Sequence, residues 1–141
     1  MTEIYGYPIH FIHIKSPEPE AFPLILTHGW PSSVVKCLNI AGPLSDPRAH
    51  GLDTAIAFDL VIPSLPGFGF SSPMTMPGWD TAHVAKAWDV LMKRLGYARY
   101  DAKGADIGSL VGKELGILKP KGLIGTHLRQ IFAHGPEVCL H

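Results

Sequence analysis

Short apolar runs separated by polar linkers are the main pattern along the chain. Runs rich in β-branched and aromatic residues, bounded by segments rich in Pro, Glu, Asp and Gly, are typical of β-strands. Five such runs predict strands over 9–14, 23–28, 58–65, 98–105 and 121–128. The remaining segment, 129–141, has neither a strand period nor a helical period, so its conformation is left open.

Two of the segments between these strands have apolar residues at helical spacing. In 80–96 the apolar residues stand at 84, 87, 88, 91, 92 and 95, which is the period of an amphipathic helix. Asp80 can cap the N-terminus of this helix, and Gly96 can close its C-terminus. A second helix is predicted over 107–119 and is expected to stop at Pro120.

A shorter helical pattern follows the second predicted strand. It covers 34–44, where Gly42 and Pro43 are expected to end the helix. Strands and helices therefore alternate along the chain. Because parallel strands need helical crossovers, we predict an α/β fold with a mostly parallel sheet and helices on both faces, in one domain that spans 1–141.

Composition narrows the classes of partner. The 12 Lys and Arg residues balance the 12 Asp and Glu residues, without a block of like charge, so we expect neither nucleic acid nor an anionic membrane surface as a partner. No run approaches the roughly 20 apolar residues of a spanning helix, and the first ten residues do not read as a leader. We therefore expect a cytoplasmic protein without a membrane span.

The cysteine, histidine and glycine patterns predict no metal and no cofactor. Cys37 and Cys139 are far apart and form no C-x-x-C motif, which favours reduced thiols. The eight His residues form no H-E-x-x-H motif. Gly67 and Gly69 begin a dinucleotide-loop pattern, but Ser72 stands where its third glycine is required.

One acidic residue, Asp106, stands between two glycines where a predicted strand meets a predicted helix. The segment reads "KGADIGSL", with Gly104 and Gly108 two residues to either side. Small residues at both places suit a sharp, strained bend packed against a helix, which is the pattern of a hydrolase nucleophile elbow. The alternative is an ordinary turn capped by Asp.

A second candidate segment, "THGWPSS", directly follows the strand predicted over 23–28. Such a loop can aim a backbone N–H at a developing negative charge and, with the N–H of Ile107, form an oxyanion hole. His28, Gly29 and Pro31 would support this loop. The alternative is a His-Gly turn made rigid by Pro31.

Five segments together resemble the epoxide hydrolases of the α/β-hydrolase superfamily, in the branch of the microsomal and juvenile-hormone enzymes. They are "PLILTHGWPSS", "FDLVIPSLPGFGFSSP", "AWDVLMKRLGYARY", "KGADIGSLVGKELG" and "LIGTHL". The resemblance covers about Ile4 to Leu128 and leaves 129–141 as an atypical tail. It implies a partial α/β-hydrolase fold, truncated at both ends and without the lid and the last strands.

The resemblance also implies a mechanism. Asp106 would attack an epoxide to give an alkyl-enzyme ester, and water would hydrolyse that ester to a diol. The backbone N–H groups of Trp30 and Ile107 would form the oxyanion hole, and the Trp30–Pro31 bond resembles one that is often cis in the superfamily. A carboxylate suits this role, since its attack on a saturated carbon gives an ordinary ester and not an anhydride. The expected substrate is a small apolar epoxide.

Two groups of residues leave alternatives open. Trp30, Phe70 and Phe132 are candidate pocket walls, although aromatic residues at such places also serve as core. Ile107 stands where the family usually has Trp, and the loss of an indole donor makes the rival activity, haloalkane dehalogenation, less favoured.

The parts of the family that complete turnover have no counterpart in the sequence. The lid Tyr residues, the His base and its acid partner are missing, so turnover by this chain alone is doubtful. A catalytically inactive remnant or a binding protein is the alternative function. An uncovered strand edge would also favour self-association.

Overall fold

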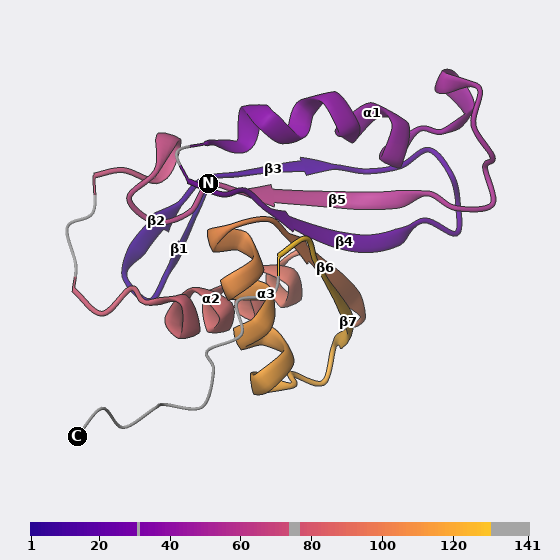
Figure 1. Ribbon diagram of the computed structural model, residues 1–141. Helices are drawn as coiled ribbons and strands as arrows, with labels where there is room; N and C mark the ends of the chain where they lie inside the picture. Colours follow the sequence, from indigo (N-terminus) through magenta and orange to yellow (C-terminus); the bar gives the residue numbers. More distant parts are fainter. Residues whose placement is uncertain (31, 74–76, 131–141) are drawn as a thin grey trace.

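The computed structural model describes residues 1–30, 32–73 and 77–130 (Figure 1). Its strands are β1 (Thr2–Ile4), β2 (Tyr7–Ile9), β3 (Phe11–Ile14), β4 (Phe22–Thr27), β5 (Phe58–Pro63), β6 (Tyr100–Gly104) and β7 (Leu123–Leu128). Its α-helices are α1 (Leu38–Ser45), α2 (Thr81–Arg94) and α3 (Ile107–Leu118). Short 3-10 turns are η1 (Val34–Cys37), η2 (Arg48–His50) and η3 (Gly69–Ser71).

Five of these strands form one sheet in the order β3-β5-β4-β6-β7. The pairs β4–β5, β4–β6 and β6–β7 are parallel, and only β3 runs antiparallel, beside β5. The predicted mostly parallel sheet is therefore confirmed. The order of the parallel strands brings the carboxyl ends of β4, β6 and β7 to one edge of the sheet, where ligands gather in such folds.

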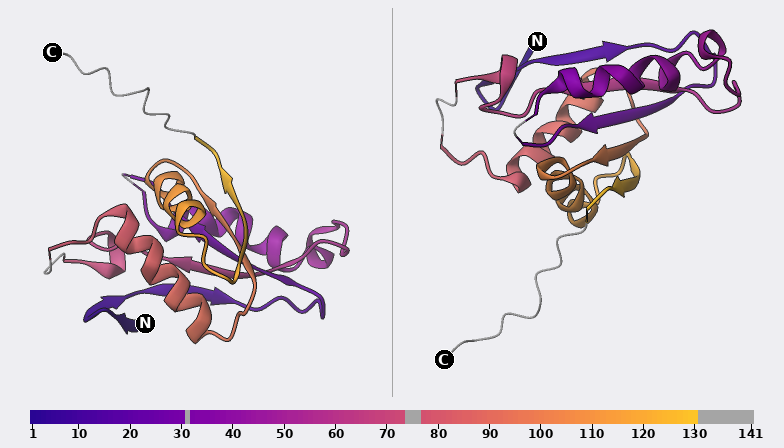
Figure 2. Two further views of the ribbon diagram at one scale, coloured as in Figure 1. Left: turned by 90° about the horizontal axis from the view of Figure 1, so that it is seen from below. Right: turned by 45° about the horizontal axis from the view of Figure 1, so that its top comes forward.

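The alternation of side chains along β4 and β5 divides the core into two layers. On one face Leu24, Leu26, Leu60 and Ile62 pack against η1 and α1. The intervening residues, Ile25 and Val61, face α2 and α3 together with Trp88 and Leu115. Figure 1 shows α1 on one side of the sheet and α2 and α3 on the other, and Figure 2 shows α1 over the half formed by β3, β5 and β4. Helices on both faces are thus confirmed.

The predicted ends of the two longer helices are confirmed. Asp80 accepts a hydrogen bond from the backbone N–H of His83 at 2.8 Å and so caps α2. Gly96, with φ of 87°, follows the last turn of α2. Helix α3 ends at Leu118, and Pro120 cannot continue it because proline lacks a backbone N–H.

The prediction of a single strand over 9–14 is wrong, because His10 belongs to neither of the two strands found there. Strand β2 ends at Ile9, and β3 begins at Phe11. The backbone N–H of His10 donates to Ser71 Oγ at 2.9 Å, and its ring Nδ1 is hydrogen bonded to Ser64 Oγ at 2.9 Å. These contacts divide the run into the second strand of an antiparallel hairpin, β1–β2, and the edge strand of the main sheet.

The expectation that Gly42 and Pro43 end the first helix is also wrong, since α1 continues to Ser45. The carbonyls in the last turn of α1 are hydrogen bonded. Ser45 Oγ donates to the carbonyl of Ala41 at 2.7 Å, and the N–H of Asp46 donates to the carbonyl of Gly42 at 2.8 Å. Gly42 serves close packing, because a Cβ there would lie 2.8 Å from the ring of His50.

Cys37 is a free thiol, and Cys139 lies outside the described residues. None of the helices in the described segments has both the length and the apolar character that crossing a bilayer requires.

Candidate active site

Asp106 occupies a strained bend between the end of β6 and the start of α3. Its backbone has φ of 56° and ψ of −120°, a combination that residues other than glycine rarely adopt. Holding a non-glycine residue in such a conformation costs on the order of 1–3 kcal/mol, and the surrounding structure must fix it. The bend is therefore maintained by the elements on either side.

The two glycines that flank Asp106 allow the close contacts that hold the bend. A Cβ at Gly104 would lie 2.0 Å from the carbonyl oxygen of Gly108, and a Cβ at Gly108 would lie 2.3 Å from the carbonyl oxygen of Thr27. Real Cβ atoms do not approach backbone this closely. The bend thus packs directly on itself and on the end of β4.

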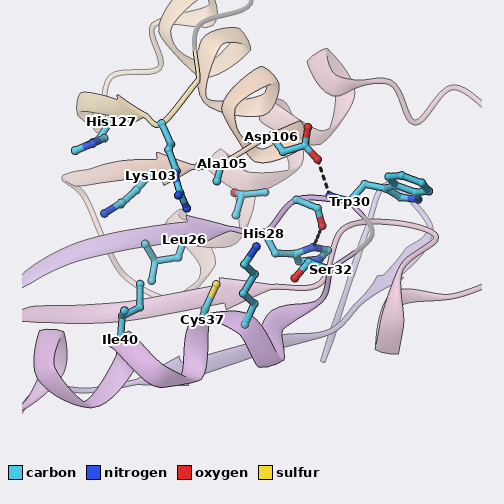
Figure 3. A pocket seen from close by; sticks show the side chains of 15 residues that line it. Leu26, His28, Trp30, Ser32, Cys37, Ile40, Lys103, Ala105, Asp106 and His127 are labelled. Atoms are coloured by element: carbon cyan, nitrogen blue, oxygen red, sulfur yellow. Dashed lines mark hydrogen bonds between the residues drawn. The ribbon is translucent and has the colours of Figure 1, made fainter.

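The loop after β4 meets the bend at the Asp106 side chain. The backbone N–H of Trp30 donates to Asp106 Oδ2 at 3.0 Å, as the dashed line in Figure 3 shows. Gly29 makes this approach possible, since a Cβ there would lie 2.7 Å from the Cβ of Asp106. Ile107 is the first residue of α3, and the first N–H groups of a helix lack intrahelical partners and favour negative charge.

His28 holds the loop after β4 in place through hydrogen bonds of its ring. The side chain is buried, with 3% of its surface exposed. Nδ1–H donates to the carbonyl of Gly29 at 3.0 Å, and Nε2 accepts from the backbone N–H of Leu65 at 3.0 Å. Burial lowers the pKa of His28, against the opposing effect of the hydrogen bond to Gly29. Because Nε2 accepts from Leu65, it carries no proton and the ring is neutral. Both ring nitrogens are occupied, and His28 is a positioning residue.

A cavity of about 700 Å³ opens in front of Asp106 (Figure 3). Leu26, Trp30 and Ile40 contribute apolar lining. Cys37 also lines it, but burial raises the pKa of its thiol, which makes Cys37 a poor nucleophile. Asp106 is thus the carboxylate at the end of a largely apolar cavity.

The three candidate wall residues have different locations. Trp30 lines the cavity and is 63% exposed. Phe70 does not line it, and its ring packs against His10 with the centroids 4.7 Å apart. Phe132 lies outside the described residues, as does Pro31 and with it the geometry of the Trp30–Pro31 bond.

The sequence reasoning missed the basic residues of the cavity. Lys36, Lys103, His127 and Arg129 also line it. Lys103 and His127 are paired across β6 and β7, and Arg129 is the first residue after β7. The sequence shows which residues of each strand share a face. It does not show the register in which β6 and β7 pair.

In the described part of the chain, no three or more His, Cys, Asp or Glu side chains are grouped so that they could hold a metal ion.

Two families of known proteins match the sequence. The family described as "Epoxide hydrolase N terminus" matches residues 1–37, and the one described as "alpha/beta hydrolase fold" matches residues 23–122. A putative epoxide hydrolase of Stigmatella aurantiaca is 49% identical over 127 residues, which is 90% of this chain and 29% of that protein. Juvenile hormone epoxide hydrolase 1 of Ctenocephalides felis is 38% identical over 139 residues, again 29% of its length.

Solved structures agree with the sequence comparison. Juvenile hormone epoxide hydrolase from the silkworm Bombyx mori superposes with a TM-score of 0.76 at 36% identity, covering 90% of this chain and 33% of that one. Aspergillus niger epoxide hydrolase gives a TM-score of 0.80 at 36% identity, covering 96% and 34%. The chain thus spans about a third or less of the length of these proteins. It belongs to the alpha/beta hydrolase fold family, in which these epoxide hydrolases are its relatives.

Proposed function

We propose that this chain carries the alkylating part of an epoxide hydrolase active site, with Asp106 as the nucleophile. The observation that carries the proposal is the hydrogen bond from Trp30 N–H to Asp106 Oδ2 at 3.0 Å, on a strained bend that faces the cavity. One carboxylate oxygen is anchored by this bond. The other, Oδ1, is left to attack.

In the proposed first step, a lone pair of Oδ1 forms a bond to one carbon of the epoxide. The bond between that carbon and the ring oxygen breaks, and the resulting alkoxide takes a proton from solvent. The product is a 2-hydroxyalkyl ester of Asp106. Relief of ring strain drives the opening, and the position of the carboxylate supplies the alignment that attack requires.

In the proposed second step, water adds to the ester carbon, and negative charge develops on Oδ2. The N–H of Trp30 already contacts this atom, and the N–H of Ile107 at the start of α3 would be the second donor. One such donor is worth about 10²–10³ in rate. Water needs a base, and the nitrogens of His28 are both occupied, so we expect the ester to accumulate in this chain.

The side chain of Ile107 favours an epoxide over a haloalkane. An alkyl halide needs a donor for the departing halide, and an aliphatic side chain offers none. An epoxide keeps its leaving oxygen attached to the substrate, so it depends less on such a donor. Haloalkane dehalogenation is the weaker alternative.

Mass spectrometry after exposure to styrene oxide tests the proposal. The expected result is one adduct per chain, located on Asp106 by peptide mapping and absent in Asp106→Asn. Asp101→Asn is the matched control. Asp101 is a half-buried acidic residue on β6, the strand that leads to the bend, and it does not line the cavity. This control should retain the adduct.

An unmodified wild-type chain that is folded by circular dichroism would overturn the proposal and favour the inactive remnant or binding protein. The cytoplasmic location inferred from the sequence stays a prediction.

A further inference from the structure

Segment 64–73, which follows β5, lies between the N-terminal part of the chain and the active site. Apart from the short turn η3 it has no regular secondary structure, so contacts with other segments must hold it in place. Among the described residues, every hydrogen bond from 64–73 to another part of the chain involves Tyr7, His10 or His28. The segment is therefore held by the region of β2 on one side and by the loop after β4 on the other.

The hydroxyl of Tyr7 is the central anchor of this segment. It donates to the carbonyls of Ser71 and, at 2.9 Å, of Pro73, and it accepts from the backbone N–H of Gly67 at 3.3 Å. The side chain is buried, and the centroid of its ring lies 5.3 Å from that of Trp79. A phenylalanine would keep this packing, so the roles of the ring and of the hydroxyl can be separated.

His10 holds both ends of the same segment. The N–H of Ser64 donates to the His10 carbonyl at 2.8 Å, and the N–H of His10 donates to Ser71 Oγ at 2.9 Å. Both serines are buried, with 0% and 1% of their surface exposed. With the ends fixed in this way, the bond from Gly67 to Tyr7 sets the course of the chain between them.

Gly67 belongs to a tight turn that contacts the ring of His28 twice. The turn is closed by the N–H of Phe68, which donates to the carbonyl of Leu65 at 2.9 Å, and Gly67 has φ of 85° at its third position, as a type II turn requires. The N–H of Leu65 donates to His28 Nε2 at 3.0 Å, and the ring of Phe68 packs edge-on against the imidazole, with the centroids 5.9 Å apart. The Tyr7 hydroxyl binds the central peptide of this turn and so fixes both contacts.

His28 and Asp106 hold opposite sides of one peptide group. The carbonyl of Gly29 accepts from His28 Nδ1–H at 3.0 Å and also from the N–H of Ser32 at 3.0 Å. The N–H of Trp30, in the same planar trans peptide, donates to Asp106 Oδ2 at 3.0 Å. Because the carbonyl and the N–H of such a peptide point in opposite directions, a rotation that takes the carbonyl from the imidazole also turns the N–H away from the carboxylate.

We propose that Tyr7 is a positioning residue for the active site. Its hydroxyl fixes the turn at Gly67, the turn fixes the ring of His28, and the ring orients the Trp30 N–H toward Asp106. Tyr7 is not among the described residues that line the cavity, so it acts on the site only through segment 64–73. The inference rests on the proposed function in so far as the oriented N–H serves the reaction.

Nuclear magnetic resonance with selective ¹⁵N labelling of tryptophan tests the proposal without a substrate. The chain has three tryptophans, and Trp30→Phe identifies the backbone amide signal of Trp30 by its loss. Asp106→Asn weakens the hydrogen bond by removing the charge and should move this amide proton to lower frequency. We expect Tyr7→Phe to move it in the same direction by a smaller amount. An amide signal at the wild-type position in folded Tyr7→Phe would overturn the proposal.

Tyr100→Phe is the matched control. Tyr100 is as deeply buried as Tyr7, and its hydroxyl donates to Asp89 Oδ1 on α2 at 2.8 Å. Each variant loses one hydrogen-bonded hydroxyl, so both should unfold at a lower urea concentration than the wild type, but Tyr100→Phe should leave the Trp30 signal unmoved. An equal displacement in both variants would indicate a general loosening of the core and would contradict the assignment to Tyr7.

The kinetics of alkylation by styrene oxide test whether the orientation serves the reaction. Misplacement by about 1 Å can lower rates about 10²-fold, and the hydroxyl acts at a distance, so we expect the maximal rate constant of Tyr7→Phe to be about tenfold below that of the wild type. The half-saturating epoxide concentration should be unchanged, and modification should still reach one adduct per chain. A lower fraction of modified chains with an unchanged rate constant would show a purely structural role and overturn the proposal.

Ser71→Ala decides the question if Tyr7→Phe does not fold. It removes the acceptor of the His10 N–H and leaves the phenol in place, so it should move the Trp30 signal in the same direction, and an unmoved signal would overturn the proposal. If the wild type is not alkylated, the proposed function fails, and the Trp30 signal still decides the positioning role. If the wild type is alkylated and Tyr7→Phe matches it in both rate and signal, the positioning role fails alone.

Discussion

The backbone N–H of Trp30 donates to the side chain of Asp106 across 3.0 Å, although the two residues are 76 positions apart in the sequence. The contact joins the loop after β4 to the bend after β6, two strands that are neighbours in the sheet. An amide hydrogen thus meets a carboxylate only because parallel pairing places both strand ends at one edge.

Gly29→Ala should disrupt the contact between the loop and the bend. The new Cβ would lie 2.7 Å from the Cβ of Asp106, so the loop must move, and misplacement of about 1 Å can lower rates about 10²-fold. We expect the rate of alkylation by styrene oxide to fall by about this factor, with a loss of about 1–3 kcal/mol in the free energy of unfolding. Stopped-time mass spectrometry and urea unfolding measure the two effects.

Gly116→Ala is the control for that substitution. Its Cβ would have an ordinary contact of 3.9 Å with Thr126 Oγ1, inside helix α3, and alanine is the better helix former by up to about 1 kcal/mol. This variant should be as reactive as the wild type and no less stable. Equal losses in both variants would show that the space around Gly29 does not govern reactivity.

Asp106→Gly should remove the strain of the bend together with the nucleophile. Glycine adopts φ of 56° and ψ of −120° without a Cβ clash, so the free energy of unfolding should be unchanged or higher by about 1 kcal/mol. The adduct with styrene oxide should be absent. A loss of stability by more than about 1 kcal/mol in urea unfolding would mean that the carboxylate supports the fold more than the bend strains it.

Stability should decrease in mild acid because of His28. Burial lowers its pKa in the folded state, so the unfolded chain binds the proton more readily, and the free energy of unfolding falls as the pH drops through about 6.5. His10 has a lowered pKa as well, through partial burial, and contributes in the same direction. Urea unfolding across this pH range measures the total slope.

His28→Gln isolates the contribution of that one ring. The variant should be less stable at neutral pH, because a Gln side chain does not reproduce both hydrogen bonds of the ring, to the carbonyl of Gly29 and from the N–H of Leu65. Its free energy of unfolding should depend less on pH than that of the wild type. His127→Gln is the control for the substitution, since His127 is exposed on β7, and its stability at neutral pH should match that of the wild type. An unchanged slope in His28→Gln would contradict the prediction.

Self-association is expected through the edge of the sheet at β7. Ile124 on this strand is 50% exposed, and an apolar edge strand can pair with another chain. Ile124→Lys should shift the protein toward monomer in sedimentation velocity. Ile117→Lys replaces an isoleucine that is 63% exposed on α3 and should not, so an equal effect of both variants would indicate general hydrophobic association.

The sequence predicted those features that depend on local pattern. The strand within 23–28 and the bend at the Gly-x-Asp-x-Gly segment can each be predicted from a few consecutive residues. Asp80 caps a helix that begins at the next residue. The hairpin β1–β2 was missed because strands of three residues are too short to show a period. The break at His10 was missed because it depends on Ser64 and Ser71.

The grouping of basic residues in the cavity depends on the same kind of distant information. Lys103 and His127 meet through the register of β6 and β7, which neither strand encodes alone. Positions on one strand can be assigned to a face, but which side chains meet across strands follows from pairing that spans the whole fold. For this reason Lys36, Lys103, His127 and Arg129 were not identified from the sequence.

The imidazole of His28 ties the carbonyl of Gly29 to the amide of Leu65. Three stretches of the chain are coupled in this way: the loop after β4, the segment after β5 and, through Trp30, the bend at Asp106. A one-residue insertion beside Leu65 would pull the imidazole out of register and carry the Trp30 amide with it. Reactivity at residue 106 is therefore sensitive to the length of a segment that touches no substrate.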